Sequence, residues 1–228
     1  MSGEDPRPRW VRDMTRFLPL KSQFLLTGNV RDLHVRQVGD KVAAMPLATV
    51  LAGTLFDAGY ADVVRWDPVE GFSVLARPGA TSGDHDGLLS SFGLSPTGGV
   101  APGGPDVLAA TLTRLAEADG DAVALMVDFA SRLVVRSDAL SPAEQQLFTR
   151  ALVLGQTARP RPVGPERTPR FNTVIWVAEK EGDLPDWLTI DNPRLRHVPI
   201  APPDRAAREA VASSLVRGLP GAREADEE

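Results

Sequence analysis

The feature that most constrains the fold of this 228-residue chain is a series of short apolar runs separated by helical patterns. Ala122–Phe129 is apolar almost throughout, where a half-buried strand would alternate apolar and polar residues. Such a run is typical of a sheet that is buried on both faces, and therefore of parallel strands joined by helices. We predict an α/β fold: a mainly parallel five-stranded sheet with helices on both faces, in a three-layer sandwich. Its strands are expected at Gln23–Thr27, Asp62–Trp66, Ala122–Phe129, Asn172–Ala178 and Arg196–Ala201.

Helical patterns alternate with these strands. The clearest begins at Ser141, because Pro142 suits the first helical position and Glu144 can complete a capping box with Ser141. Gly155 is expected to end this helix. The alternation of apolar and polar residues in Leu33–Val42 predicts a small exposed hairpin. The helices are expected at Pro46–Ala58, Asp106–Ala118, Ser141–Leu154 and Asp204–Arg217.

The organisation predicted from these patterns is a single domain over residues 20–217. An N-terminal arm of residues 1–19 precedes it, and an acidic tail of residues 218–228 follows it. Residues 78–105 are rich in glycine and proline, and residues 156–170 are rich in arginine and proline. Both segments have too few apolar residues to offset the entropy of ordering them, so we expect two long mobile loops.

Composition excludes several classes of protein. There is no cysteine, which rules out disulfides, a thiol nucleophile and a zinc–thiolate site. The three histidines have no metal-ligand spacing, and the net charge of −5 disfavours general binding to nucleic acid. No apolar run is long enough to span a membrane and no signal peptide is recognisable, so a cytoplasmic protein is expected. The preference for arginine over lysine indicates a high-GC, bacterial genome.

Asp128 is the first candidate for a functional residue. It lies at the end of an apolar strand, where P-loop ATPases carry an aspartate that helps to hold Mg²⁺. Ligands of open α/β sheets gather at this carboxyl edge. The next residue, Phe129, cannot accept a proton and so cannot activate water. The alternative interpretation is an ordinary carboxylate that caps the end of the strand.

The turn after the first strand is the second candidate. In a P-loop protein, G-x-x-x-x-G-K-[ST] would stand here, with glycines that expose backbone N–H groups to the phosphates and a lysine that neutralises their charge. That motif occurs nowhere in the chain. Gly28, Asn29 and Arg31 are the residues that could contact a nucleotide in an atypical phosphate loop. The alternative is a simple turn in which Arg31 pairs with Asp32 at the surface.

The third candidate is the region 171–208, which carries a resemblance to a known family. A buried strand leads into Leu184-Pro185, then Arg194 and Arg196, a short strand and the helix start at Asp204. This order is similar to AAA-type P-loop ATPases, and in particular to their degenerate N-terminal P-loop-like domain that lacks a Walker A motif. The resemblance covers most of residues 20–217 and implies a P-loop NTPase-like fold. It places Arg194 or Arg196 near the arginine finger of the family, while Glu179-Lys180 stands where the family has the Thr-Asn of its sensor.

Two classes of function follow. The resemblance implies a non-catalytic module that assembles with an AAA ATPase or regulates it, with an ATPase domain in cis or in trans, or a second copy of the chain, as its partner. No cofactor, nucleic acid or membrane is expected for such a module. The alternative is a domain that binds and hydrolyses Mg-ATP, with Asp128 as the Mg²⁺ ligand and Gly28–Arg31 as an atypical phosphate loop. A more distant option is a domain that binds a strand or a helix of another protein.

Overall fold

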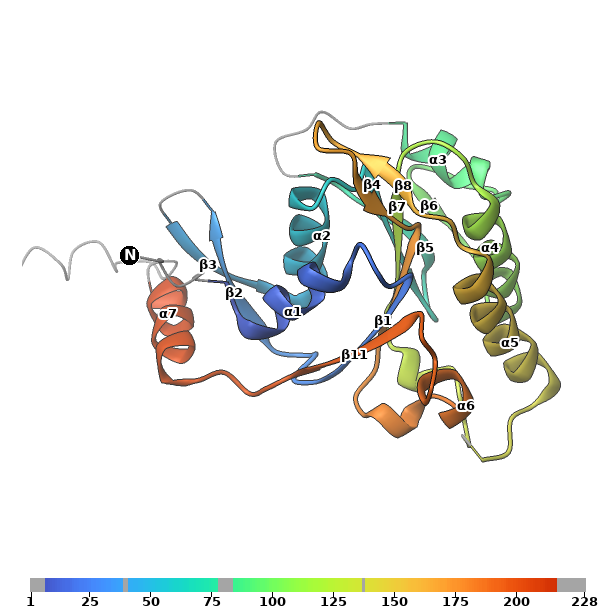
Figure 1. The fold of residues 1–228 in the computed structure, drawn as a ribbon. Coiled ribbons are helices and arrows are strands. Elements are labelled where there is room, and N and C mark those ends of the chain that lie inside the picture. Colours follow the sequence, from blue (N-terminus) through green and yellow to red (C-terminus); the bar gives the residue numbers. More distant parts are fainter. Residues whose placement is uncertain (1–6, 39–40, 78–83, 137, 217–228) are drawn as a thin grey trace, which may run out of the picture.

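The computed structural model of the chain describes residues 7–38, 41–77, 84–136 and 138–216, and over these residues it contains a seven-stranded sheet. The strand order is β11-β1-β10-β7-β4-β5-β6 (Figure 1). The pairs from β11 to β4 are parallel, whereas β5 and β6 are added in antiparallel orientation. The parallel strands are β1 (Gln23–Gly28), β4 (Asp62–Asp67), β7 (Val123–Val127), β10 (Thr173–Val177) and β11 (Leu195–Ile200).

The predicted fold class is confirmed, because these parallel strands are the five expected from the apolar runs. The two further strands are β5 (Gly71–Leu75) and β6 (Val100–Ala101). Successive residues of a strand face opposite sides of the sheet, so the continuous apolar runs supply two separate cores. In β7, Leu125 belongs to one core and Met126 to the other. The core that contains Leu125 is covered by α4 (Pro105–Glu117) and α5 (Pro142–Thr157), and the opposite face by α1 (Arg9–Phe17) and α2 (Leu47–Asp57) (Figure 1).

Helix α1 lies within the expected N-terminal arm and is part of the domain core. Trp10, Val11 and Met14 are buried in the core on this face of the sheet. The acidic tail 218–228 lies outside the described residues. None of the helices in the described ranges has the length and apolar character that crossing a membrane would need.

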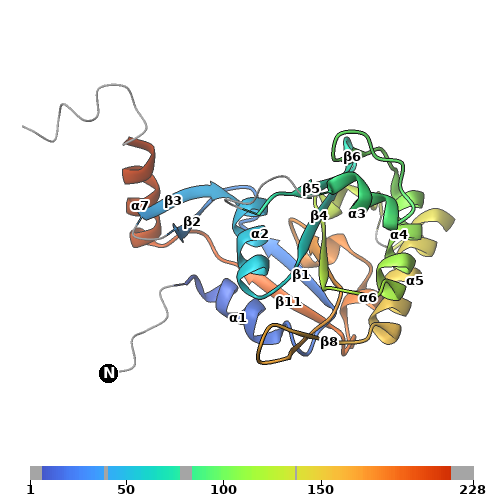
Figure 2. The ribbon, with the colours of Figure 1, turned by 90° about the horizontal axis from the view of Figure 1, so that it is seen from above.

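The hairpin predicted from residue 33 onward is confirmed, although its turn residues 39–40 lie outside the described part of the chain. It consists of β2 (Leu33–Val38) and β3 (Lys41–Pro46) and forms a separate two-stranded sheet. Helix α7 (Arg205–Val216) packs against this hairpin. Figures 1 and 2 show the hairpin and α7 together on one side of the main sheet, and we call this unit the wing.

The expectation of a loop throughout residues 78–105 is wrong for its described part, residues 84–105; residues 78–83 lie outside the description. This part contains α3 (His85–Ser91) and β6, and it buries Leu89 and Phe92. Asp84 accepts a hydrogen bond from the Gly87 N–H and so caps α3. The Asp86 carboxylate accepts the N–H groups of Gly98 and Gly99, at 3.3 and 2.6 Å. Side chains thus satisfy backbone donors of a glycine-rich segment, which allows it to pack despite its composition.

The second expected loop, residues 156–170, is also partly regular. The capping box of Ser141 and Glu144 is confirmed, but α5 continues through Gly155 to Thr157. Gly155 is buried rather than terminal, because a Cβ there would lie 2.9 Å from the Gln23 amide nitrogen. A short hairpin of β8 (Arg161–Val163) and β9 (Thr168–Arg170) follows. The remaining short elements are the 3₁₀ turns η1 (Ala130–Arg132) and η2 (Glu181–Asp183) and helix α6 (Asp186–Thr189).

Candidate functional site

The carboxyl edge of the parallel sheet gathers polar residues from several strands. Asp67 ends β4, Asp128 follows β7 and Glu179 follows β10 shortly after its last residue. Parallel strands place these ends at one edge, where ligands of open α/β sheets bind. Asp128 lies at the centre of the edge, and its side chain is only 9% exposed.

The Asp128 carboxylate is held by two arginines. Its Oδ1 accepts hydrogen bonds from Arg31 Nη1 at 2.7 Å and from the Phe129 N–H at 2.8 Å. Its Oδ2 accepts from Arg65 Nε at 3.1 Å and Nη2 at 3.0 Å. Both oxygens therefore have two donors each, and the negative charge is neutralised by guanidinium groups from two different parts of the chain.

The network extends on both sides of Asp128. Arg65 also contacts Asp67 at 3.4 Å, and Asp67 in turn accepts the backbone N–H groups of the β4–β5 turn. Arg31 lies over the Phe129 ring, with 3.8 Å between the guanidinium carbon and the ring centroid. Phe129 has a left-handed backbone with φ of +53°, which turns its ring toward Arg31. Two arginines and two aspartates thus form a closed, electrically balanced cluster.

Gly28 ends β1 and Asn29 follows it, two residues before Arg31 of the cluster. Its backbone donors are used within the sheet: the Gly28 N–H donates to Glu179 O at 3.1 Å and the Asn29 N–H to Ile200 O at 2.9 Å. The Val30 N–H donates to Gly28 O at 2.7 Å. Gly28 is required here, because its φ is +92° and a Cβ would lie 2.6 Å from the Ile200 carbonyl oxygen. A phosphate cradle needs free N–H groups, and these three already have acceptors.

The connection that follows differs from a phosphate loop. A P-loop leads from a strand directly into a helix, whose N-terminus faces the phosphates. Here β1 is followed by the β2–β3 hairpin, and α2 begins only at Leu47. A cavity of about 320 Å³ lies between the β1–β2 connection, the start of α2 and the Arg31–Asp128 pair. This volume is at the lower end of the range of small-molecule pockets, roughly 300–1,000 Å³.

The residues of this edge do not fit Mg-ATP. Mg²⁺ requires oxygen ligands with free lone pairs, whereas each Asp128 oxygen already accepts two hydrogen bonds. Among the described residues, no group of three or more histidine or acidic side chains could hold a metal ion. No lysine contributes to the cluster in the described ranges.

Glu179 and Lys180, which the sequence analysis compared with the sensor residues of AAA ATPases, make internal contacts. The Glu179 N–H donates to Ser131 Oγ at 2.7 Å, and Ser131 Oγ donates to Asp183 at the same distance. The Lys180 N–H donates to the same Asp183 oxygen at 2.8 Å. These bonds tie the turn after β7 to the turn after β10, and Arg132 adds an exposed ion pair with Glu179 at 3.1 Å.

The two arginines compared with an arginine finger lie elsewhere. Arg194 directly precedes β11 and Arg196 is its second residue, at the amino edge of the sheet, so the structure does not bring them to Asp128. The Arg194 guanidinium lies 5.4 Å from the Phe171 ring centroid. Arg196 pairs with Asp13 of α1 at 3.0 Å and lies over the Phe17 ring.

The sequence analysis selected Asp128 and Arg31, which the structure places in contact, but not Arg65, Ser131 or Asp183. The signal for Arg65 was available: it is a basic residue inside a strand that is otherwise buried, next to its carboxyl end. The expected surface pair of Arg31 and Asp32 is not formed, because Arg31 reaches Asp128. Ser131 and Asp183 carry no pattern that distinguishes them from ordinary turn residues.

Comparison with protein families supports the architecture. A family model described as "AAA+ chaperone, N-terminal Rossmann-like domain" matches residues 2–201, which includes α1, the wing hairpin and the whole sheet. A comparison with curated proteins found no match to the chain.

Proposed function

Since this chain belongs to the family of N-terminal Rossmann-like domains of AAA+ chaperones, we propose that it is a non-catalytic module that assembles with an AAA ATPase and regulates it. The ATPase domain stands in cis or in trans. The family membership supports the association with an ATPase, and the chemistry of the carboxyl edge supports the absence of catalysis in this module.

The observation that carries the proposal is the state of Asp128. A carboxylate that neutralises two arginines stabilises the fold, and releasing it for Mg²⁺ would leave Arg31 without its counter-charge and Arg65 with Asp67 alone. The triphosphate would in addition find no free N–H groups at residues 28–30. The residues needed for hydrolysis, a phosphate-binding lysine and a carboxylate after Asp128, have no counterparts in the sequence.

Nucleotide binding is tested by titration calorimetry with Mg-ATP and by a phosphate-release assay. We expect neither micromolar binding nor turnover from the wild-type chain. Asp128→Asn, which keeps the shape of the side chain, serves as the matched variant. Micromolar binding or turnover that disappears in Asp128→Asn would instead support the ATP-hydrolysing alternative.

Assembly is tested with an AAA ATPase that carries the G-x-x-x-x-G-K-[ST] motif. A partner in cis would be found as this motif in the remainder of the open reading frame. A partner in trans is sought among the AAA ATPases of the same genome, by co-purification and by its ATPase rate with and without the chain. We expect a stable complex and a changed ATPase rate; no complex with any of these ATPases would contradict the proposal.

A further inference from the structure

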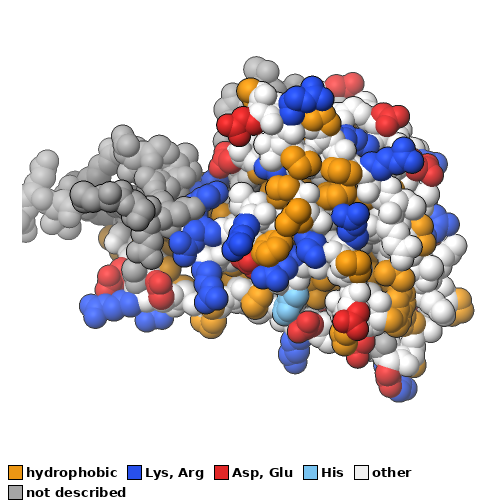
Figure 3. Space-filling model, in the orientation of Figure 1, with side chains coloured by type: hydrophobic (Ala, Val, Ile, Leu, Met, Phe, Trp, Pro, Cys, Tyr) orange, Lys and Arg blue, Asp and Glu red, His pale blue; other side chains and the backbone are white. Residues whose placement is uncertain are grey.

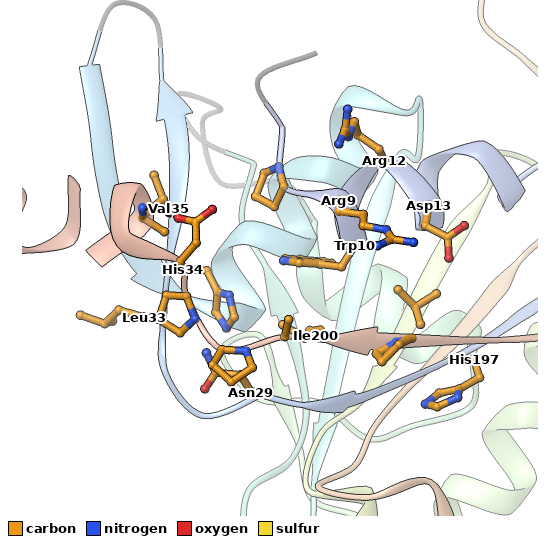
Figure 4. A pocket seen from close by; sticks show the side chains of 18 of the residues that line it. Arg9, Trp10, Arg12, Asp13, Asn29, Leu33, His34, Val35, His197 and Ile200 are labelled. Carbon is orange, nitrogen blue, oxygen red and sulfur yellow. Dashed lines mark hydrogen bonds between the residues drawn. The ribbon is translucent and has the colours of Figure 1, made fainter. Parts of the chain in front are cut away.

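A second, larger hollow lies between the main sheet and the wing, along the edge strand β11. It has a volume of about 970 Å³ and is bounded by α1, the start of β2, β11 and the first half of α7. Figure 4 shows that Arg9 and Arg12 line it from α1, whereas Leu33 and His34 line it from the hairpin. We call this hollow the wing groove. Leu33 lines both this groove and the smaller cavity beside the Asp128 cluster, whereas none of the charged residues of that cluster lines the groove.

The rim of the wing groove is basic. Arg9, Arg12 and Arg16 recur at helical spacing along α1, and Figure 3 shows Lys and Arg side chains gathered over this helix. Within the described part of the chain, neither Arg9 nor Arg12 forms an ion pair with an acidic side chain, and the Arg16 guanidinium lies 5.7 Å from the centroid of the Phe17 ring. Arginines in the first turn add to the positive end of the helix dipole, which destabilises the helix unless an anion approaches.

The acidic side chains of the groove are already engaged. Asp13 accepts two hydrogen bonds from Arg196, and Asp204 accepts the N–H of Ala207 at the start of α7. Asp13 is thereby paired with Arg196, whereas Asp204 keeps its negative charge, because a backbone N–H carries no net charge. The lining still holds more arginines than carboxylates, since Arg9, Arg12, Arg16 and Arg196 stand against Asp13 and Asp204. The groove retains positive charge in a chain whose net charge is −5.

The inner wall of the groove is apolar and contains two unsatisfied polar atoms. Trp10 meets His34 edge-on, with 5.8 Å between the ring centroids, and Ile200 continues this wall. His34 is more than nine-tenths buried, and its Nε2 has no hydrogen-bond partner among the described residues. Nε of Arg196, on the same groove, also lacks one. Buried polar atoms nearly always have a partner, and a water molecule or a ligand atom would supply one at each of these two positions.

The shape of the groove favours an extended occupant. Residues 196–204 line it without interruption. In the described sheet, β11 is an edge strand with one side unpaired, and Pro199 in that edge removes one backbone donor. Nine consecutive residues in extended form span about 30 Å, which is far longer than a single phosphate or carboxylate needs.

We propose that the wing groove binds an extended acidic peptide segment of a partner protein. Its carboxylates pair with Arg9 and Arg12, and its apolar side chains pack on Leu33 and Val35, which line the groove and are only partly buried. Successive side chains of an extended peptide point in opposite directions, so a peptide that alternates acidic and apolar residues presents its carboxylates to the basic rim and its apolar side chains to the inner wall. This inference goes beyond the proposed function and does not depend on it, because the groove and the Asp128 cluster are separate.

The test uses a fluorescein-labelled ten-residue peptide that alternates glutamate with valine, and measures fluorescence anisotropy with the full chain. Two control peptides replace every glutamate by serine or by lysine. We expect micromolar binding of the glutamate peptide, weakened by added salt, and at least tenfold weaker binding of both controls. The Arg9→Gln/Arg12→Gln double variant should raise the Kd of the glutamate peptide about fivefold. Arg159→Gln, which changes an exposed arginine outside the groove, should leave the Kd unchanged.

Several outcomes would overturn the inference. One is the lack of binding of the glutamate peptide at about 1 mM, and another is equal binding of the serine peptide. A Kd that stays the same in the double variant would show that α1 is not the contact. Equal affinity for a ten-nucleotide single-stranded RNA, or displacement of the peptide by millimolar inorganic phosphate, would indicate a general anion site. The double variant is expected to fold, since removing cations from the first turn does not weaken the helix. A failure here leaves the ATPase-assembly experiments unaffected.

Discussion

Asp128→Ala should destabilise the chain strongly, although Asp128 follows a buried parallel strand, where P-loop ATPases carry a Mg²⁺ ligand. The change removes four accepted hydrogen bonds and leaves the Arg31 and Arg65 side chains, 37% and 24% exposed, without their shared counter-charge. Removing one member of a buried ion pair costs about 3–5 kcal/mol. Because both arginines can recover some hydration, we expect a loss of about 2–4 kcal/mol in the free energy of unfolding. For a chain of this length, that lowers the Tm by about 4–16 °C.

The assay is urea and thermal unfolding without nucleotide or Mg²⁺. The matched control is Asp138→Ala, since Asp138 pairs with Arg136 at 3.1 Å but both side chains are about 70% exposed. That variant should stay within about 0.5 kcal/mol of the wild type. A double-mutant cycle of Asp128→Ala with Arg65→Gln should give a coupling of about 1 kcal/mol or more.

The result that refutes this reasoning is specific. A carboxylate kept for Mg²⁺ is uncompensated in the metal-free protein, so its removal would be neutral or stabilising. Mg²⁺ would then raise the Tm of the wild type but not that of Asp128→Ala, because a ligand that binds the native state stabilises it. Either observation would show that Arg31 and Arg65 do not hold Asp128 in the way the structure indicates.

The remaining predictions concern ionisable and capping groups. Burial raises the pKa of Tyr60, the only tyrosine, to about 12. The absorbance of the phenolate should therefore not appear at pH 11 until the chain unfolds, and the free energy of unfolding should fall as the pH rises above 10. Ordinary titration near pH 10 would contradict this. Burial lowers the pKa of His34 below 6.5, so the unfolded chain takes up a proton first and the wild type should lose stability as the pH falls through 6.5. In urea unfolding, the His34→Gln variant should lose less free energy of unfolding than the wild type between pH 7.5 and 5. Equal losses would be inconsistent with a buried neutral imidazole. Ser141→Ala should cost about 0.5–2 kcal/mol by removing the capping box. Hydrogen bonds from Ser141 lower the pKa of Glu144, so the stabilisation by the capping box is present above the ordinary carboxyl pKa and is lost in acid. If Ser141→Ala is as stable as the wild type at pH 7, the capping box does not contribute to stability.

The parallel strands and the strongest helix start could be predicted because their signals are local. A continuous apolar run specifies burial on both faces, and the Ser141–Glu144 capping box satisfies donors only three residues apart. By contrast, α3 and β6 escaped prediction because composition alone suggested disorder. Their order comes from Asp84 and Asp86, whose carboxylates accept N–H groups of glycines that sequence patterns treat as loop residues.

Gly155 is a second position at which the local sequence pattern did not predict the structure. A glycine at the end of a helical pattern normally ends the helix, yet α5 continues past it. What decides the matter is the close approach of Gln23 from β1, whose amide donates to Ala151 O and accepts from Trp176 Nε1. The approach of a second element is a property of the packed fold, and it overrides the local preference.

The sequence by itself determined the five parallel strands and placed Asp128 at the carboxyl end of β7. Both follow from the local pattern of apolar and polar residues, because side chains of a strand alternate between the two faces of the sheet. Only the tertiary structure decided what Asp128 binds. Its partners Arg31 and Arg65 are 97 and 63 residues away along the chain, and they reach it because β1 and β4 end at the same edge of the sheet as β7. Strand order and register decide which charged side chains lie close enough to form an ion pair, and neither is a property of any local stretch of residues.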